Sequence, residues 1–265
     1  MDGSPELFCR TYGDAGSPVV ILHGLLGSAD NWHPIAKRLG EQHRVLALDL
    51  RNHGRSCHHP DASLAAMADD VLAFLATHQL ASATLLGHSL GGRIAMLAAT
   101  GSPPAVSSLI VVDMALRAYP PRHLPILAAM QALPLADCRT RADADAALAP
   151  AMPDPAERQL VLKCLANGPD GLHWRVNLPA LLAAYPSYIA ALPLPGTYAG
   201  PALFVAGGKS DYLTPAEQPA LRAAFPNARF ATIKDASHWV HADAPDLLLD
   251  LAEGFLAETA RPVRW

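Results

Sequence analysis

Cysteine is scarce in this chain of 265 residues, and the four that occur are widely separated: Cys9, Cys57, Cys138 and Cys164. Zinc sites and disulfide frameworks use closely spaced or paired cysteines, so this distribution argues against both. The chain also lacks a run of about 18 apolar residues, which a membrane-spanning helix would need. Its first six residues have neither the positive charge nor the apolar stretch of a signal peptide. We therefore expect a cytoplasmic protein with reduced thiols and no association with a membrane.

Charge is also sparse, since charged residues make up 17% of the chain and the formal net charge is only −4. No cluster of lysine and arginine interleaved with aromatic residues marks a nucleic-acid surface, so no nucleic-acid partner is expected. Hydrophobic residues, in contrast, make up 51% of the chain. A chain of this length and composition can bury one sizeable core, which predicts a globular protein rather than a disordered one.

The most informative stretch is the pentapeptide Gly87-His88-Ser89-Leu90-Gly91. It follows an apolar run at 83–86 and precedes an amphipathic run at 92–98. A strand, then Gly-x-Ser-x-Gly, then a helix is the pattern of a nucleophile elbow, whose tight turn leaves no room for a Cβ at either glycine. Ser89 is the predicted nucleophile at the apex. The alternative is a chance match in a loop, which the flanking strand and helix disfavour.

A glycine-rich turn near the N-terminus has the composition of an oxyanion loop. The sequence His23-Gly24-Leu25-Leu26-Gly27-Ser28 follows an apolar run at 19–22 that is predicted to be a buried strand. The backbone N–H groups of Leu25 and Leu90 are the predicted oxyanion donors. Taken without the elbow, the same segment would be interpreted as an ordinary strand-to-helix turn.

His238 is the predicted general base. It lies in Asp235-Ala236-Ser237-His238-Trp239, after an expected strand at 228–233 and before a final helix. A histidine just past a sheet strand can reach back to the serine. His241, in the same loop, is the competing candidate. The histidines at positions 58, 59 and 88 have weaker claims.

Two aspartates compete for the role of the acid that orients the histidine. Asp211 follows the expected strand at 202–206, and Asp113 ends the expected strand at 109–112. Both lie at carboxyl ends of strands, where ligands bind in open α/β sheets. Either aspartate gives the chain order serine, acid, histidine. Asp211 is preferred because Thr214 and Pro215 already supply the cap and first turn of the next helix, and Asp113 stays as the alternative.

Together these segments resemble the α/β-hydrolase superfamily, and within it the small bacterial serine esterases. The resemblance covers nearly the whole chain except a middle section, and includes Asp49-Leu50-Arg51-Asn52-His53-Gly54-Arg55-Ser56. It implies an α/β-hydrolase fold, with a mainly parallel sheet flanked by helices. Some esterases of this branch carry the acid at the position of Asp113, which keeps the choice of acid open. The Asp49 segment is predicted to buttress the oxyanion loop by hydrogen bonds rather than to react.

The alternation of strands and helices stops between about residues 115 and 200, where prolines crowd and no sheet strand is evident. This segment is interpreted as an inserted helical cap over the active site. The predicted division is therefore a hydrolase core at 1–114 and 200–265 with a cap at 115–199. The alternative is a helical decoration remote from the site. Trp174 and Tyr185 are candidates for the pocket lining, although core packing is the favoured role for both.

The predicted activity is that of a serine esterase cleaving small carboxylic esters through an acyl-enzyme. The predicted partner is therefore a small-molecule ester, and neither a metal nor a cofactor is expected. The same triad can also serve thioester cleavage, carbon–carbon bond hydrolysis or acyl transfer to another acceptor. A non-catalytic binding module is the alternative of a different class, because fold alone does not fix function.

Overall fold

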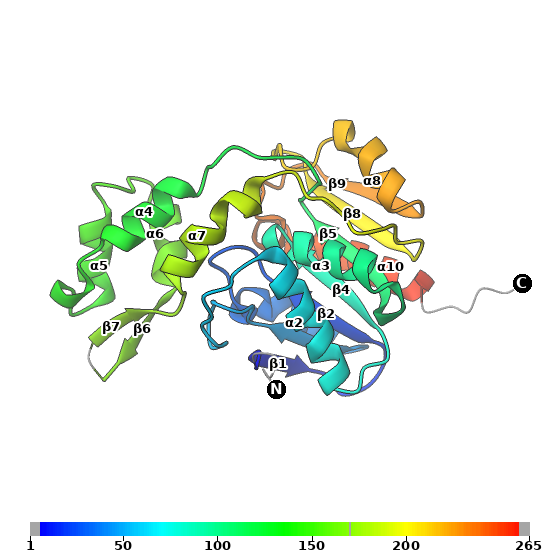
Figure 1. Ribbon diagram of the computed structural model, residues 1–265, viewed down its shortest axis with the longest axis horizontal. Coiled ribbons are helices and arrows are strands. Elements are labelled where there is room, and N and C mark those ends of the chain that lie inside the picture. The colour runs from blue at the N-terminus through cyan, green and yellow to red at the C-terminus, as the bar shows by residue number, and fades with distance from the viewer. Residues whose placement is uncertain (1–5, 170, 260–265) are drawn as a thin grey trace, which may run out of the picture.

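The computed structural model describes residues 6–169 and 171–259, and in this part of the chain seven strands form one sheet (Figure 1). Its spatial order is β1-β3-β2-β4-β5-β8-β9. β1 pairs antiparallel with β3, and every other pair in this sheet is parallel. The strands are β1 (Cys9–Tyr12), β2 (Pro18–Leu22), β3 (Arg44–Leu48), β4 (Ala83–His88), β5 (Val106–Val112), β8 (Ala202–Gly207) and β9 (Ala228–Ile233).

Helices cover both faces of the sheet, so the inner strands β2, β4 and β8 are buried on both sides and mostly apolar. Along β2, Val20 and Leu22 pack in one hydrophobic cluster, whereas Val19 and Ile21 pack in another. The first cluster contains residues of α2 (Leu64–Thr77), α3 (Leu90–Gly101) and α8 (Gln218–Ala224). The second contains residues of α1 (His33–Leu39), α9 (Val240–Asp243) and α10 (Pro245–Thr259). Short 3-10 helices complete the connections: η1 (Ala29–Trp32), η2 (Pro103–Ala105), η3 (Leu135–Asp137) and η4 (Pro215–Glu217).

The middle section, called here the insertion (residues 115–199), leaves the sheet after β5 and returns at β8. It lies to one side of the sheet and contains most of the green segments in Figure 1. Its helices are α4 (Leu124–Ala132), α5 (Arg141–Leu148), α6 (Pro155–Leu162) and α7 (Leu178–Ile189). It also contains an antiparallel pair of strands, β6 (Leu165–Gly168) and β7 (Gly171–Trp174). The expectation of a segment without strands was therefore wrong at this hairpin.

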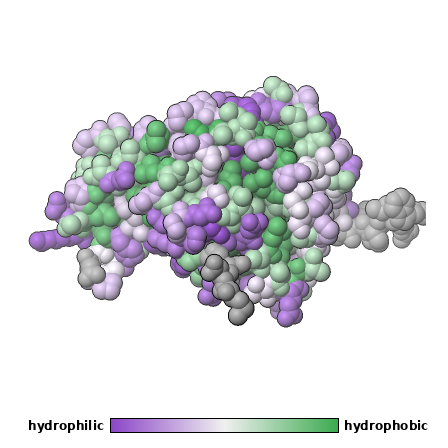
Figure 2. Space-filling model, viewed as in Figure 1, coloured by the Kyte–Doolittle hydropathy of each residue, from purple (hydrophilic) through white to green (hydrophobic). Residues whose placement is uncertain are grey.

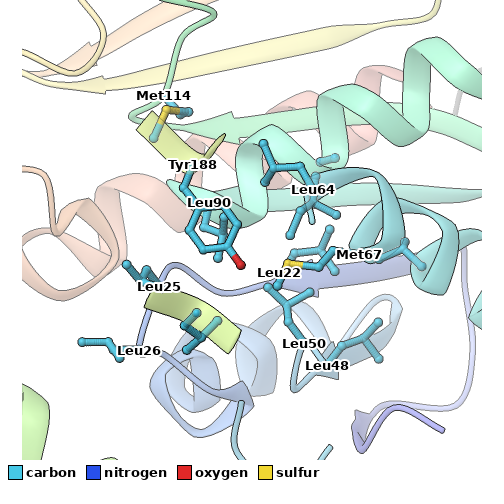
Figure 3. Close-up of a cluster of buried hydrophobic side chains, with 14 of the residues drawn as sticks. Leu22, Leu25, Leu26, Leu48, Leu50, Leu64, Met67, Leu90, Met114 and Tyr188 are labelled. Carbon is cyan, nitrogen blue, oxygen red and sulfur yellow. The ribbon is translucent and has the colours of Figure 1, made fainter. Parts of the chain in front are cut away.

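The two ends of the insertion are hydrogen-bonded to each other where it joins the core. The N–H of Leu192 donates to the carbonyl of Leu116 over 2.8 Å, and the N–H of Tyr119 donates to the carbonyl of Ile189 over 2.8 Å. We call these paired segments, 115–119 and 189–192, the neck. Next to the neck, Tyr188 of α7 packs among core residues such as Leu90 and Leu64 (Figure 3). The insertion is thus packed against the core.

Few large hydrophobic side chains are strongly exposed among the described residues. On the side shown in Figure 2, hydrophobic residues lie among hydrophilic ones over both the insertion and the core. Leu124 and Leu247 are the large hydrophobic residues that are strongly exposed, with 44% and 56% of their surface accessible. None of the helices in residues 6–169 and 171–259 combines the length and the apolar character needed to cross a membrane.

Candidate active site

The turn between β4 and α3 has the geometry that the Gly-x-Ser-x-Gly pattern predicts. Ser89 has φ +52° and ψ −116°, a backbone conformation that residues other than glycine rarely adopt. A Cβ at Gly87 would lie 2.2 Å from the carbonyl oxygen of Gly91, and a Cβ at Gly91 would lie 2.2 Å from that of Leu22. The predicted steric need for both glycines is confirmed. The strained turn places Ser89 at the start of α3.

Three side chains form a continuous hydrogen-bonded chain at this edge of the sheet. The Nε2 atom of His238 lies 3.0 Å from the Oγ atom of Ser89. Its Nδ1 atom lies 2.8 Å from the Oδ2 atom of Asp113. The carboxylate of Asp113 is fully buried and also accepts hydrogen bonds from the N–H of Gly207, over 3.0 Å, and from the hydroxyl of Ser210. These bonds hold a buried carboxylate in one orientation beside the imidazole.

Asp211 does not reach His238, which corrects the preference for Asp211 as the acid. Its two carboxylate oxygens accept hydrogen bonds of 2.6 and 2.5 Å from the guanidinium of Arg122. This ion pair is exposed, and the hydrogen bonds from Arg122 lower the pKa of the Asp211 carboxyl. The turn after β8 directs the N–H of Gly207 and the hydroxyl of Ser210 toward Asp113. The loop expected to supply the acid therefore supplies donors to the other candidate.

Two other histidines of this region, His88 and His241, have pKa values that burial lowers. His88 is buried, and one of its ring nitrogens donates to the carbonyl of His238 over 2.8 Å. Burial lowers the pKa of His88 well below its usual value. The ring of His241 stacks on Trp32 with centroids 4.7 Å apart, and burial lowers its pKa to about 4. Among the described residues, only His238 bridges Ser89 and a carboxylate.

His58 and His59 are exposed, as expected for solvated loop residues. The ring of Tyr212 stacks on that of His238 with centroids 3.8 Å apart and an interplanar angle of 23°. This contact covers one face of the imidazole. It was not anticipated from the sequence, although Tyr212 directly follows Asp211, one of the two candidate acids.

The two predicted oxyanion donors border a cavity beside Ser89. Leu25 and Leu90 line it together with the serine. Leu90 is the first residue of α3, and the N–H groups of a helix's first turn have no partner within the helix. Among the described residues, no acceptor takes a hydrogen bond from the N–H of Leu25. Neither N–H group therefore has a hydrogen-bond acceptor among the described residues, as the prediction requires.

The Asp49 segment braces the oxyanion loop, as predicted. The Asp49 carboxylate accepts hydrogen bonds from the N–H of Ala29, over 2.6 Å, and from the N–H of Arg55, over 2.8 Å. The N–H of Leu50 donates to Nε2 of His23 over 3.0 Å, so the Nδ1–H of His23 donates to the Gly24 carbonyl over 2.8 Å. Burial lowers the pKa of His23 to about 4, which keeps this bridging ring neutral. The hydrogen bonds of Asp49 and His23 thus fix the loop that carries Leu25.

The cavity beside Ser89, called here the inner cavity, has a volume of about 30 Å³. Five of its lining residues come from the insertion: Tyr119, His123, Tyr185, Tyr188 and Ile189. Sequence reasoning named Tyr185 as a candidate and missed the other four. Trp174 lines none of the pockets described here and packs against the hydrophobic cluster.

A second pocket of about 910 Å³, called here the vestibule, shares Leu25, His123 and Tyr212 with the inner cavity. Its lining also includes His238, so it reaches the same reacting groups. The vestibule carries charges of both signs: Arg122, Arg141, Lys163 and Arg175, and also Asp30, Asp154, Glu157 and Asp243. The site therefore combines a narrow, mostly apolar recess with a wide, polar approach.

Comparison with known proteins agrees with this geometry. Residues 17–245 match the family model described as alpha/beta hydrolase fold. The chain is 37% identical to a mouse protein named sn-1-specific diacylglycerol lipase ABHD11 over 254 residues, covering 92% of this chain and 83% of that protein. It is 36% identical to Esterase YbfF of Escherichia coli over 241 residues, covering 91% and 93%.

Among solved structures, a marine microorganism esterase superposes with a TM-score of 0.92 and 34% identity, covering 95% of this chain and 100% of that one. The similarity spans the elbow, the His238 loop and the insertion alike, because it extends over almost the entire length of both chains. The chain belongs to the α/β-hydrolase family.

Proposed function

We propose that this protein is a serine hydrolase of carboxylic esters, with Ser89 as nucleophile, His238 as general base and Asp113 as the orienting acid. The observation that supports this most directly is the chain of contacts from Ser89 Oγ through the His238 ring to Asp113 Oδ2. A neutral imidazole has one donor nitrogen and one acceptor nitrogen. Because Nδ1 faces a carboxylate, it carries the proton, and Nε2 is left to accept the proton of Ser89.

The reaction would then run in two halves. Ser89 Oγ bonds to the acyl carbon while its proton moves to Nε2 of His238, and Asp113 stabilises the resulting imidazolium. The tetrahedral intermediate collapses when the ester C–O bond breaks and His238 gives that proton to the departing alcohol. Water repeats the sequence on the acyl-enzyme, which releases the acid and restores Ser89.

The N–H groups of Leu25 and Leu90 are proposed as the oxyanion donors. They border the inner cavity on the side of Ser89, and the loop of Leu25 is held by the Asp49 and His23 hydrogen bonds. A fixed donor needs no reorganisation when negative charge develops on the carbonyl oxygen, and removal of one such donor typically costs about 10²–10³ in turnover.

The insertion is proposed to act as the cap, and residues 1–114 and 200–265 as the hydrolase core. Its residues Tyr119, Tyr185, Tyr188 and Ile189 share the inner cavity with Ser89, which argues against a decoration remote from the site. The small size of the inner cavity favours a short acyl group. The wider vestibule would then accommodate the alcohol part of the ester.

The vestibule also favours a second candidate among esters, an acylglycerol whose alcohol part is bulky. Its volume of about 910 Å³ lies in the range of pockets that hold drug-sized ligands. One relative is named a diacylglycerol lipase and another an esterase, so the similarity alone does not choose between the two.

A panel of nitrophenyl esters of graded acyl length, together with a monoacylglycerol and a diacylglycerol, tests the proposal. Short-chain nitrophenyl esters are expected to be the better substrates, and a fluorophosphonate probe is expected to label Ser89. Failure of the probe to label Ser89, with no hydrolysis of any ester, would contradict the proposal and favour a binding module. Preference for the acylglycerols would favour the second candidate.

The compartment that we propose is the cytoplasm. The four cysteines are free thiols, which is the state that a reducing compartment maintains. Separating the producing cells into cytosolic, membrane and secreted fractions and assaying each with the best nitrophenyl ester tests this, and activity mainly outside the cytosol would contradict it.

A further inference from the structure

Arg93 lies on α3 one helical turn after Ser89 and is fully buried. It lines the inner cavity together with Ser89 and Leu90. The reaction proposed above assigns it no role. A guanidinium in such a position requires an explanation, because burying a charge without a partner is costly.

The partners of Arg93 are not carboxylates. Nη1 donates to the carbonyl of Ala190 over 2.5 Å, and Nη2 donates to the carbonyl of Arg117 over 2.6 Å. Nε lies 3.4 Å from the sulfur of Met114. Within residues 6–169 and 171–259, Arg93 forms no ion pair, and burial lowers its pKa. The guanidinium is therefore satisfied by backbone carbonyls and by its position 5.1 Å from the ring centroid of Tyr119.

Those two carbonyls belong to the two different segments of the neck. Arg117 is in the segment that leaves the core, and Ala190 is the residue at which α7 ends as the chain returns. The neck segments are also bonded to each other, through Leu192 to Leu116 and Tyr119 to Ile189. A single side chain from the helix that begins after Ser89 thus holds both ends of the insertion.

The walls of the inner cavity adjoin these carbonyls in sequence. Tyr119 comes two residues after Arg117, and Tyr188 and Ile189 come directly before Ala190. All three line the cavity. The hydroxyl of Tyr119 is further fixed between the N–H of Ala115 and the carbonyl of Tyr212. Loss of the Arg93 bonds would release the cavity walls relative to Ser89 and leave Ser89, His238 and Asp113 in place.

We propose that Arg93 is a positioning residue that sets the depth of the inner cavity, and so the acyl length accepted, by fastening both neck segments to the helix of Ser89. This inference rests on the proposed ester hydrolysis. Loosening the neck is expected to admit longer acyl groups without removing a reacting group.

The test compares kcat/KM for nitrophenyl acetate and nitrophenyl hexanoate in the parent and in Arg93→Met, which keeps the side-chain length and removes the donors. The parent is expected to prefer acetate. In Arg93→Met the hexanoate-to-acetate ratio is expected to rise about tenfold, because each methylene that becomes buried can contribute about fourfold. Arg93→Lys, which can still bond one carbonyl, is expected to give an intermediate ratio.

Arg139→Met is the matched control, because it makes the same change at an exposed arginine of the insertion that lines neither the inner cavity nor the vestibule. Its ratio is expected to stay near that of the parent. If circular dichroism shows that Arg93→Met does not fold, the ratio in Arg93→Lys decides, and a ratio equal to the parent's overturns the proposal.

Two other results also overturn it. An equal loss of kcat/KM on both esters would mean that Arg93 only supports the fold. A loss confined to a nitrophenyl monoester of succinic acid would mean that Arg93 binds a carboxylate of the substrate. If the parent neither hydrolyses the esters nor reacts with fluorophosphonate at Ser89, the proposed function itself fails, which is a distinguishable outcome.

Discussion

The core and the insertion contribute to the same cavity in different ways. From the core come Ser89, His238 and Asp113, whose polar atoms contact one another within 3.0 Å. The insertion contributes walls such as Tyr185, Tyr188 and Ile189. The groups proposed to react are thus held by the sheet, and the groups proposed to select the substrate are held by a segment joined to the sheet at the neck. Changes in the core should alter the rate on every ester, whereas changes in the insertion should alter the ratio between esters.

The largest expected effect comes from removing the nucleophile. Ser89→Ala should fold like the parent and lose turnover by about 10⁴-fold or more, because loss of a triad member leaves only binding and the oxyanion donors. Ester hydrolysis and fluorophosphonate labelling measure the loss, and circular dichroism checks the fold. Activity within about tenfold of the parent would exclude Ser89 as the nucleophile.

The second largest effect on turnover is expected from the two aspartates. Asp113 contacts His238 within the core, whereas Asp211 forms an ion pair with Arg122 of the insertion. Asp113→Asn should lower turnover by up to about 10⁴-fold, because an amide can stabilise the wrong tautomer of His238. Asp211→Asn should change turnover little, since Asp211 bonds to exposed Arg122 of the insertion. Measuring the turnover of both variants on one short ester identifies the acid. A large loss of turnover in Asp211→Asn together with a small loss in Asp113→Asn would assign the role of acid to Asp211.

Acid should destabilise the core through its buried histidines. His23 and His53 have 1% or less of their surface exposed, and burial lowers their pKa values to about 4 and about 3. Between those values and an unfolded pKa near 6.5, the unfolded chain binds protons that the folded chain does not, so stability falls as the pH falls. Each of these histidines contributes about 1.4 kcal/mol per pH unit in this range.

Urea unfolding at pH 7, 6 and 5 measures this slope. His53→Gln should make the slope shallower, because the variant lacks one of the groups that take up protons on unfolding. His58→Gln, in an exposed loop, is the control and should leave the slope unchanged. An equal slope in the parent and in His53→Gln would refute the assignment.

The smallest effect is expected from the insertion. Ile189→Ala removes part of a wall of the inner cavity and keeps the backbone carbonyl that Tyr119 uses. The preference for short acyl groups should weaken by a few-fold, because each additional buried methylene contributes about 0.8 kcal/mol. Ratios of kcat/KM across the ester panel measure it, with Leu124→Ala on the exposed side of α4 as the control. A uniform drop on all esters would contradict the division of roles.

Local pattern was enough to predict the elbow and the brace beneath the oxyanion loop. The steric demand at Gly87 and Gly91 follows from a short motif, whereas for the Asp49 segment only a supporting role was expected, without the particular hydrogen bonds of Asp49. The contact between His238 and Ser89 was expected from the order of elements along a parallel sheet. These features depend on residues near one another in sequence, or on the rule that strand ends share one edge.

The choice of acid could not be made in that way. β5 and β8 are neighbours in the sheet, so Asp113 and Asp211 both follow strands that end at the same edge. What separates them is the conformation of two turns. Asp113 directly follows β5, with φ +50°, whereas Asp211 lies four residues beyond the end of β8. The choice of Asp211 depended on which residue caps the next helix, and that does not predict the backbone angles of these turns.

The hairpin of β6 and β7 was missed although Gly168-Pro169-Asp170-Gly171 has the composition of a turn. Each strand has only four residues, and proline crowding around them obscured the alternation of polar and apolar residues. The lining role of Tyr119, Tyr188 and Ile189 has no local signal, because it depends on how the two neck segments and the end of α7 come to lie beside Ser89.

The pairing of the two neck segments has a consequence for how such a protein can change. Leu116 and Leu192 are 76 positions apart in the chain and are joined by one backbone hydrogen bond of 2.8 Å. A segment of quite different length could be spliced between these points if it also replaces the contacts that the insertion makes with the core, such as those of Tyr188 and Asn177. The junction is thus a natural boundary for exchange between relatives. A chimera cut there, with Arg93 retained, would acquire a donor's substrate range and keep the catalytic apparatus of this chain.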